Sequence, residues 1–306
     1  MNILDRIEAI VGSEYVLHDE PMHKHTTFRT GGAAKLAVMP QNAEQIAELV
    51  GILEKEGIPY VPVGNGSNLL VSDRGYDGVV ILLGKLLGNI NINAKECIIR
   101  AESGVLLSVV GAKALEKNLA GFEFAAGIPG TVGGGCVMNA GAYGGELKDV
   151  LESVKAVDRT GSMVEFPVSC LKMGYRHSIF LNREYIITEA VFKLHPGNYD
   201  EIAGKMADFS AQRRAKQPLE YPSAGSTFKR PDGFFAGQLI EEAGLKGKGF
   251  GDACVSEKHA GFVINKGNAT SQDIYDTIRM AADAVYERSG IRLEPEVKFL
   301  GDFGKL

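Results

Sequence analysis

The chain has 306 residues, of which 45% are hydrophobic, and a formal net charge of -5. This length is enough for two or three domains, each with a hydrophobic core of its own. The acidic balance gives no overall attraction to a phosphate backbone, so we expect no nucleic-acid partner and favour a small-molecule site.

The N-terminal stretch MNILDRIEAIVGSEYV predicts a short amphipathic helix and not a signal peptide, because Asp5 and Glu8 lie inside its only apolar run. No stretch of the chain approaches the roughly 20 uninterrupted apolar residues that span a bilayer. The cysteines are Cys97, Cys136, Cys170 and Cys254. They lie far apart without C-x-x-C spacing, which indicates reduced thiols and neither disulfides nor a structural zinc site. We therefore expect a cytoplasmic protein without membrane insertion.

The region up to residue 84 predicts a helix followed by two strands. The helix would begin at Asn42, with Gln45 three residues later, and end at Gly57. This pattern indicates a capped helix with one apolar face. The stretch PYVPVGNGSN predicts a strand that runs into a glycine loop. GVVILLG, Gly78 to Gly84, predicts a second, buried strand.

The region from Lys95 to Leu194 mixes helix and strand. ECIIRAESG predicts a strand and VLLSVVGAKALEKNLAG a helix, and a glycine-rich segment follows them. SVKAVDRTGSMVEF predicts two strands joined by a turn at Asp158 to Ser162. REYIITEAVFKL, Arg183 to Leu194, predicts a long further strand. These hairpins indicate a mixed α and β region and not a strict alternation of parallel strands and helices.

A break near residue 200 precedes a final α+β region. Pro196 to Asn198 end the preceding strand, and a polar helix with a basic end follows them. The elements expected beyond it are a helix at Gly237 to Ala243, a strand at Gly261 to Ile264, a helix from Thr270 to Arg288 with Asp273 in a capping box, and the closing strand PEVKFLG.

Many of the 38 glycines gather in two windows, GNGSN at Gly64 to Asn68 and AAGIPGTVGGGCVMNAGAYGGE at Ala125 to Glu146. Such density marks backbone that bends sharply or closely approaches another group. GNGSN by itself allows either a tight turn or a concave set of N–H groups for phosphate. Neither window is a P-loop or a G-x-G-x-x-G fingerprint. Two such windows favour an extended ligand such as a dinucleotide.

Six motifs occur in order along the chain: HTTFRTGG, PVGNGSNLLVSDRGYDGVVI, AAGIPGTVGGGCVMNAGAYGGE, GYRHSIF, AGSTFKRP and LEPEVKFLG. With them the chain resembles the UDP-N-acetylenolpyruvoylglucosamine reductase (MurB) family over nearly its full length. The resemblance implies an α+β protein with a two-subdomain FAD-binding fold of the vanillyl-alcohol-oxidase (PCMH) type, over roughly Phe28 to His195. A separate α+β substrate-binding domain would follow, giving the division 1–93, 94–200 and 201–306. It also implies noncovalent FAD, with NADPH as cosubstrate.

The resemblance assigns cofactor contacts to both glycine windows. The residues at the FAD pyrophosphate would be Gly64, Asn65, Gly66, Ser67 and Asn68. Those along the rest of the cofactor would be Ile128, Pro129, Gly130, Gly133, Gly134, Ala140, Gly141 and Ala142. Cys136 lies in the same window, and we interpret it as a small buried residue and not as a flavin attachment point.

The family reaction reduces the enolpyruvyl ether of UDP-N-acetylglucosamine in peptidoglycan precursor synthesis. Hydride addition to the terminal alkene carbon leaves negative charge beside a carboxylate, so the reaction needs a cation there and a proton for the neighbouring carbon. The resemblance gives Arg176 the first role, since a guanidinium binds a carboxylate through two hydrogen bonds. It makes Ser226, which lies in no G-x-S-x-G elbow, the proton donor, and it places Glu296 near the enolate. Without the motifs these would be a surface arginine, a turn serine and an ion-pair partner.

Further substrate contacts are expected from Tyr175, Lys216, Lys229, Arg230 and Lys246. We expect no metal, because His23 and His25 have no third ligand nearby. Ile179 to Pro196 predicts one uninterrupted strand, with no room for the tyrosine-bearing loop of some members. This indicates the shorter class of the family, in which Tyr143 or Tyr175 would substitute for that loop. The sequence leaves the oligomeric state open, and we expect a monomer.

Two other classes of function stay open. The first is an FAD-dependent oxidase or dehydrogenase of the same fold that acts on another sugar or alcohol. Such an enzyme removes hydride and has no use for a proton donor to carbon, so Ser226 with Glu296 favours the reductase. The second is a nucleotide-binding module without catalysis.

Overall fold

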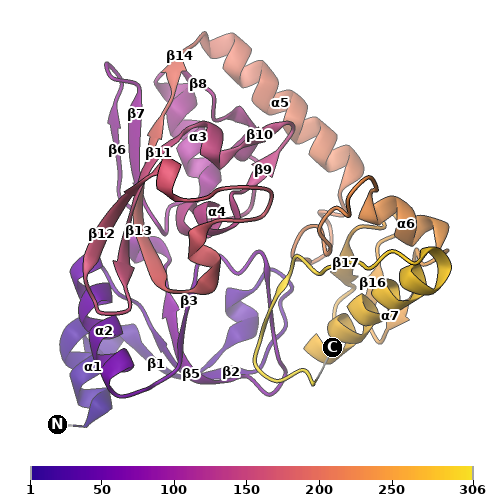
Figure 1. The fold of residues 1–306 in the computed structure, drawn as a ribbon, viewed down its shortest axis with the longest axis horizontal. Helices are drawn as coiled ribbons and strands as arrows, with labels where there is room; N and C mark the ends of the chain where they lie inside the picture. The colour runs from indigo at the N-terminus through magenta and orange to yellow at the C-terminus, as the bar shows by residue number, and fades with distance from the viewer. Residues whose placement is uncertain (1, 305–306) are drawn as a thin grey trace. The chain divides into compact units, whose positions relative to one another are not determined.

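The computed structural model describes residues 2–304 (Figure 1), and their contacts divide the chain into two compact units. Unit 1 comprises Met1–His18, Leu36–Asn65 and Gly78–Gln212. Unit 2 comprises Asp19–Lys35, Gly66–Asp77 and Arg213–Leu306. The chain therefore enters unit 2 twice before its C-terminal part, and the first glycine window is divided between the units after Asn65.

A four-stranded sheet in the order β1-β2-β5-β3 follows the N-terminal helix α1 (Ile3–Val11). Its strands are β1 (Val16–Pro21), β2 (Ala33–Val38), β3 (Tyr60–Val63) and β5 (Tyr76–Leu82), and β3 pairs with β5 in parallel. Helix α2 (Ala43–Lys55) begins as predicted at Asn42, whose side chain accepts from the N–H of Gln45 at 2.8 Å. The apolar faces of α1 and α2 are buried in one core with residues of β5, which explains their amphipathic pattern.

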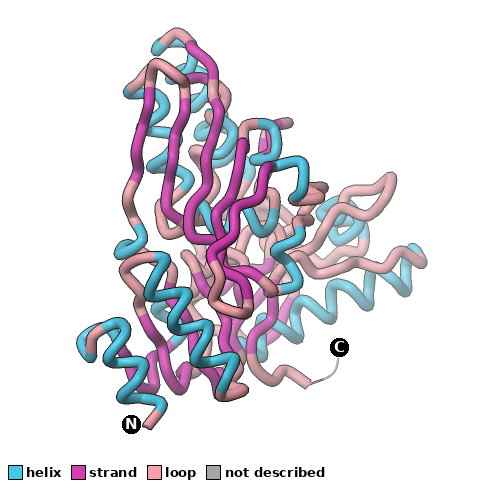
Figure 2. The backbone as a smooth tube through the Cα atoms, turned by 60° about the vertical axis from the view of Figure 1, so that its left-hand side comes forward, coloured by secondary structure: helices cyan, strands magenta, loops and turns pink. Residues whose placement is uncertain are grey.

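The second sheet of unit 1 is antiparallel, in the order β12-β11-β13-β7-β6, and its long strands run side by side (Figure 2). It consists of β6 (Ile90–Asn93), β7 (Ile98–Glu102), β11 (Leu151–Asp158), β12 (Met163–Pro167) and β13 (Tyr185–Lys193). The predicted β11–β12 hairpin is confirmed, and Asp158 Oδ1 accepts from the N–H groups of Thr160 and Ser162 in its turn. Helices α3 (Leu107–Glu116) and α4 (Val132–Met138) contact this sheet over an apolar core.

Helix α4 lies inside the second glycine window, where the sequence predicts no regular element. Glycine costs about 1 kcal/mol relative to alanine in a helix interior, so propensity does not explain this helix. Close packing does. A Cβ on Gly133 would lie 2.9 Å from the Cβ of Ser103, and one on Gly135 would lie 3.0 Å from Leu147 Cδ1. Two of the clustered glycines therefore let a short helix pack tightly against its neighbours.

Unit 2 packs the long helix α7 (Ser271–Ser289) against the sheet β15-β16-β17, as Figure 1 shows. The strands are β15 (Gly249–Phe250), β16 (Ala253–Val255) and β17 (Val263–Asn265), and α6 (Ala236–Glu242) joins the same core. The capping box of Thr270 and Asp273 forms as predicted. A further strand, β18 (Lys298–Leu300), pairs in parallel with β4 (Leu69–Val71), so the segment after the first glycine window is built into unit 2.

The single strand expected from Ile179 to Pro196 is wrong. Ile179–Asn182 form a 3-10 turn, Arg183 follows with φ +61°, and only then does β13 begin, before the two-residue strand β14 (His195–Pro196). The hydroxyl of Ser178 starts the turn by accepting from the N–H of Phe180 at 3.3 Å, a local bond that competes with strand pairing.

Two further strands differ from their predicted bounds. The closing strand is shorter than PEVKFLG, so Glu296 precedes it. The strand expected at Gly261 to Ile264 lies at Val263–Asn265.

The remaining described elements are short apart from one helix. The predicted polar helix is α5 (Tyr199–Lys216), and β8 (Leu119–Ala120) pairs with β14. A small hairpin in the second glycine window joins β9 (Gly141–Ala142) to β10 (Gly145–Glu146). The four cysteines are free thiols. Within residues 2–304, no helix has both the length and the apolar character that crossing a membrane requires.

Candidate active site

The first two residues of GNGSN, Gly64 and Asn65, lie beside the second glycine window within unit 1. Asn65 Nδ2 donates to the carbonyl oxygen of Pro129 at 2.6 Å. Gly64 lies against Thr131, and a Cβ on Gly64 would lie 2.5 Å from Thr131 Oγ1, closer than a real side chain comes. Residue 64 is therefore best occupied by glycine, because its backbone closely approaches the side chain of Thr131 in the second window.

The later residues of the first window are fixed inside unit 2. Gly66 has φ +58°, which favours glycine, and its carbonyl oxygen accepts from the N–H of Thr27 at 3.2 Å. Asn68 Nδ2 donates to the carbonyl of Glu296 at 3.2 Å, and the carbonyl of Asn68 accepts from the N–H of Lys298 at 3.0 Å. This half of the window is thus held by the first and last of the six motifs, HTTFRTGG and LEPEVKFLG.

The predicted cofactor residues of the second window include buried and open backbone. Gly133 and Ala140 are buried, Pro129 and Gly134 are exposed, and Ile128, Gly130, Gly141 and Ala142 are partly exposed. Cys136 is fully buried, and the loss of solvation raises the pKa of its thiol to about 12. A thiol that keeps its proton is a poor nucleophile, so Cys136 is a packing residue.

Arg176 lies at the tip of a tight turn in unit 1. Gly174 and His177 exchange two backbone hydrogen bonds of 3.0 and 3.1 Å, with Tyr175 and Arg176 between them. Arg176 is half-buried and has φ +52°, a left-handed conformation that residues with a side chain seldom adopt. Such strained backbone gathers at functional sites, where the surrounding structure holds it. The guanidinium carbon lies 5.1 Å from the ring centroid of Tyr175, within cation–π range.

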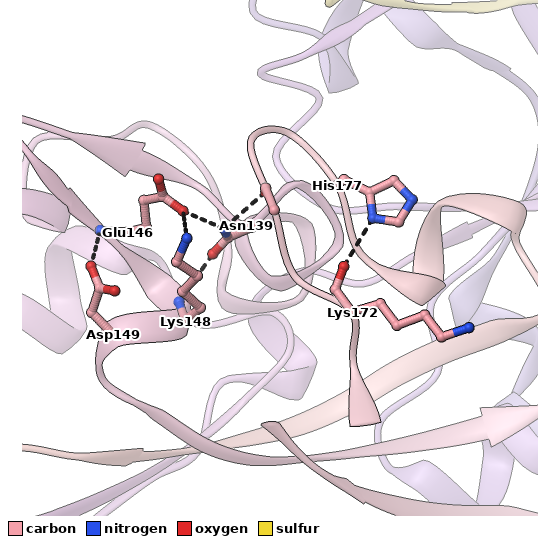
Figure 3. A network of polar contacts seen from close by, with 7 residues as sticks. Asn139, Glu146, Lys148, Asp149, Lys172 and His177 are labelled. Atoms are coloured by element: carbon pink, nitrogen blue, oxygen red, sulfur yellow. Dashed lines mark hydrogen bonds and ion pairs between the residues drawn. The ribbon is translucent and has the colours of Figure 1, made fainter. Parts of the chain in front are cut away.

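A polar network connects this turn to the second glycine window (Figure 3). Asn139, the left-handed C-cap of α4, donates from Nδ2 to Glu146 Oε2 at 2.6 Å and to the carbonyl of Gly174 at 3.0 Å. Its Oδ1 accepts from the N–H of Lys148 at 3.0 Å. The side chain of Lys148 pairs with Glu146 at 2.9 Å, and this contact is the main reason that the pKa of Glu146 lies below its ordinary value. The charge of Arg176 acts in the same direction.

Ser226 and Glu296 both lie in unit 2, where Thr227 connects them. The N–H of Thr227 donates to the carbonyl of Gly261 at 2.8 Å, and its Oγ1 accepts from the N–H of Val263 at 2.9 Å. Its carbonyl accepts from the N–H of Glu296 at 2.8 Å. Thr227 is 1% exposed, Ser226 is exposed, and Oε2 of Glu296 is shielded from solvent. The threonine in AGSTFKRPDG therefore fixes the backbone that carries Ser226.

The predicted substrate cations of unit 2 have different surroundings. Lys229 forms an ion pair with Glu294, and Lys246 pairs with Glu241 at 2.6 Å. Arg230 is exposed, with its guanidinium carbon 4.5 Å from an aromatic ring centroid, that of Phe235. Lys216 is exposed at the end of α5. Both lysines are thus paired with a glutamate, whereas the guanidinium of Arg230 lies against an aromatic ring.

The structure brings together the backbone segments of Ser226 and Glu296 in unit 2, whereas Arg176 belongs to unit 1.

His25 Nε2 lies 3.0 Å from Glu20 Oε1, and residues 2–304 contain no group of three or more metal-ligating side chains. Sequence reasoning missed the residues that hold the site, Thr227 and Asn139. An asparagine just after a short helix is a recognised C-cap signal, but the glycine density concealed that helix.

Comparison with known proteins accounts for both parts of the chain. Residues 34–167 match the family described as FAD binding domain, and residues 217–300 match UDP-N-acetylenolpyruvoylglucosamine reductase, C-terminal domain. A relative named UDP-N-acetylenolpyruvoylglucosamine reductase from Geobacillus thermodenitrificans is 49% identical, with 98% of each chain covered. One of the same name from Clostridioides difficile is 50% identical over 96% of each chain.

Solved structures agree with this assignment. The crystal structure of UDP-N-acetylenolpyruvylglucosamine reductase (MurB) from Thermus caldophilus has a TM-score of 0.79 at 34% identity and covers 94% of this chain and 98% of that one. A glucose dehydrogenase, wild-type Phl p 4.0202, has a TM-score of 0.51 at 15% identity and covers 64% of this chain and 44% of that one. This second likeness concerns the fold alone. The predicted fold class, an FAD-binding fold joined to a further α+β domain, is confirmed.

Proposed function

Because the chain belongs to the UDP-N-acetylenolpyruvoylglucosamine reductase family, we propose that it reduces UDP-N-acetylglucosamine enolpyruvate to UDP-N-acetylmuramate, a step in peptidoglycan precursor synthesis. NADPH supplies a hydride and the medium a proton, so one carbon–carbon double bond becomes a single bond and NADP⁺ is released. The observation that carries this function is the connection of Ser226 to Glu296 through Thr227. The residue after Ser226 is thus bonded through its backbone to Glu296, which supports a role for both residues in protonating the substrate carbon.

The residues present fit FAD as the cofactor. Gly64 has no space for a Cβ where the two glycine windows meet, and the backbone at Gly134 is exposed beside it. When bound, FAD would take the hydride from NADPH and give it to the alkene. The residues that would hold it are those predicted in the two windows, from Gly64 to Asn68 and from Ile128 to Ala142. With Cys136 buried and protonated, we propose noncovalent binding.

Three side chains would carry the reaction. Arg176, permanently charged, binds the substrate carboxylate and stabilises the negative charge that develops beside it. Ser226 delivers the proton of its hydroxyl to the carbon that bears this charge, and Glu296 assists that transfer. Since the hydroxyl of Ser226 is exposed, the bound substrate must exclude water from it before it can act as an acid.

The finer assignments form part of the same proposal. Tyr175 and the four cations Lys216, Lys229, Arg230 and Lys246 would contact the UDP-sugar. The chain would divide functionally into 1–93, 94–200 and 201–306 and belong to the shorter class of the family. It would act as a monomer in the cytoplasm, in cell wall biogenesis.

Rapid mixing of Ser226→Ala tests the function, because the two half-reactions can be followed separately. Without oxygen, NADPH should bleach the flavin of the variant at the wild-type rate. Reoxidation by UDP-N-acetylglucosamine enolpyruvate should be slower by roughly 10²- to 10⁴-fold, the range that a lost general acid gives. Unchanged reoxidation would remove Ser226 from the mechanism. A wild-type protein that reacts rapidly with oxygen but not with the enolpyruvyl substrate would instead be an oxidase.

A further inference from the structure

The side chain of Asn139 contacts the turn that carries Arg176 from outside it. Gly174 opens this turn, and its carbonyl oxygen accepts two hydrogen bonds, one from the N–H of His177 at 3.1 Å and one from the side-chain amide of Asn139 at 3.0 Å. Arg176 occupies a left-handed conformation at φ +52°, which costs roughly 1–2 kcal/mol for a residue with a Cβ. Something outside the turn must therefore keep it in place.

Asn139 is suited to this task because its own position is fixed. It is 1% exposed, and its backbone N–H donates to the carbonyl of Cys136 at 3.3 Å at the end of α4. Its side-chain oxygen accepts from the N–H of Lys148, and its side-chain nitrogen donates to Glu146 as well as to Gly174. Both ends of the amide are thus engaged, which settles its orientation.

We propose that Asn139 is a positioning residue for Arg176. It would hold the turn that carries Arg176 through the carbonyl of Gly174, without affecting the reduction of the flavin by NADPH. This inference rests on the proposed function, in which Arg176 meets the substrate carboxylate. Glu146 orients the Asn139 amide and adds a negative charge that favours the guanidinium.

The variant Asn139→Asp isolates the contact. An aspartate keeps the oxygen that accepts from Lys148 but replaces the donor NH₂ by an acceptor that faces the Gly174 carbonyl and the Glu146 carboxylate. We expect flavin reduction by NADPH to stay within about threefold of wild type and reoxidation by the enolpyruvyl substrate to slow by about 10- to 100-fold, as for a misplaced catalytic group. Lys148→Ala is the matched control, since it removes the ion pair with Glu146 but keeps the backbone N–H that Asn139 accepts from. It should react like wild type.

Hydrogen exchange of the flavin-free protein gives a readout that does not depend on activity. In Asn139→Asp the amides of Gly174 and His177 should exchange faster, while those of α5 stay unchanged. Equal exchange at this turn, or equal slowing of both half-reactions, would overturn the inference, and loss of flavin would assign Asn139 to the cofactor loop instead. If the wild-type flavin is not reoxidised by the enolpyruvyl substrate, the proposed function fails, whereas the exchange result still tests the contact.

Discussion

Asp73 belongs to the first glycine motif, PVGNGSNLLVSDRGYDGVVI, yet its contacts point to stability and not to a cofactor. Its carboxylate accepts from the N–H of Ser271 and from the N–H of Gln272, both at 2.9 Å. These are the first two residues of α7, and the third N–H, of Asp273, donates to Thr270 Oγ1 at 3.0 Å. The side chains of Asp73 and Thr270 therefore satisfy the donors that a helix leaves open at its N-terminus.

The variant Asp73→Ala should lower the free energy of unfolding. Ser271 is 0% exposed, so its N–H loses its acceptor without gaining water, at a cost of about 1–3 kcal/mol. The lost charge at the helix N-terminus adds about 0.3–1 kcal/mol. Together these give about 1.3–4 kcal/mol. Asp73→Asn keeps one acceptor oxygen and should lose less.

Thermal unfolding of the flavin-free protein, followed by circular dichroism, measures this change. Each kcal/mol should lower the melting temperature by roughly 2–4 °C for chains of this size class. The matched control is Asp77→Ala, which removes an exposed ion pair with Lys35 at 3.2 Å from the same segment and should change stability by less than about 1 kcal/mol. A melting temperature of Asp73→Ala equal to that of the control would refute the reasoning. Flavin loss without loss of stability would assign Asp73 to the cofactor.

Three other changes test separate parts of the structure. Thr227→Val removes the acceptor of a buried β17 N–H and should slow reoxidation of the flavin by the enolpyruvyl substrate. Thr227→Ser keeps the hydroxyl and should not slow it. Equal rates in the two variants would contradict the role given to the hydroxyl. Burial lowers the pKa of His259, so the unfolded chain binds the proton first and stability falls as the pH drops below about 6.5. His259→Asn should therefore melt with a shallower dependence on pH, and an unchanged slope would show that this histidine does not titrate on unfolding. Gly64→Ala should weaken FAD binding measured by fluorescence, because its Cβ would lie 2.5 Å from a threonine hydroxyl. The control Gly51→Ala on α2, where the nearest contact to the new Cβ is 4.0 Å away, should bind FAD normally. Equal affinities in the two variants would argue against a close approach at residue 64.

Elements specified by their own residues could be predicted from the sequence. The Asn42 cap of α2, the capping box of α7 and the Asp158 turn of the β11–β12 hairpin each form within a few residues of the chain, and all three are confirmed. The fold class followed from motifs, and the comparisons confirm it. Ser226, Arg176 and Glu296 came from the same motifs, and their roles stay predictions.

Only the tertiary structure decided how those residues are held. The hydroxyl of Thr227 meets an N–H 36 residues away, and Asn139 meets a carbonyl 35 residues away, so neither contact leaves a local signal. The glycine-rich α4 forms because its neighbours pack closely on it, against its own propensity. Capping and turn signals act within one turn of chain, whereas packing and buried hydrogen bonds depend on which distant segments meet, and that is settled only when the whole chain has folded.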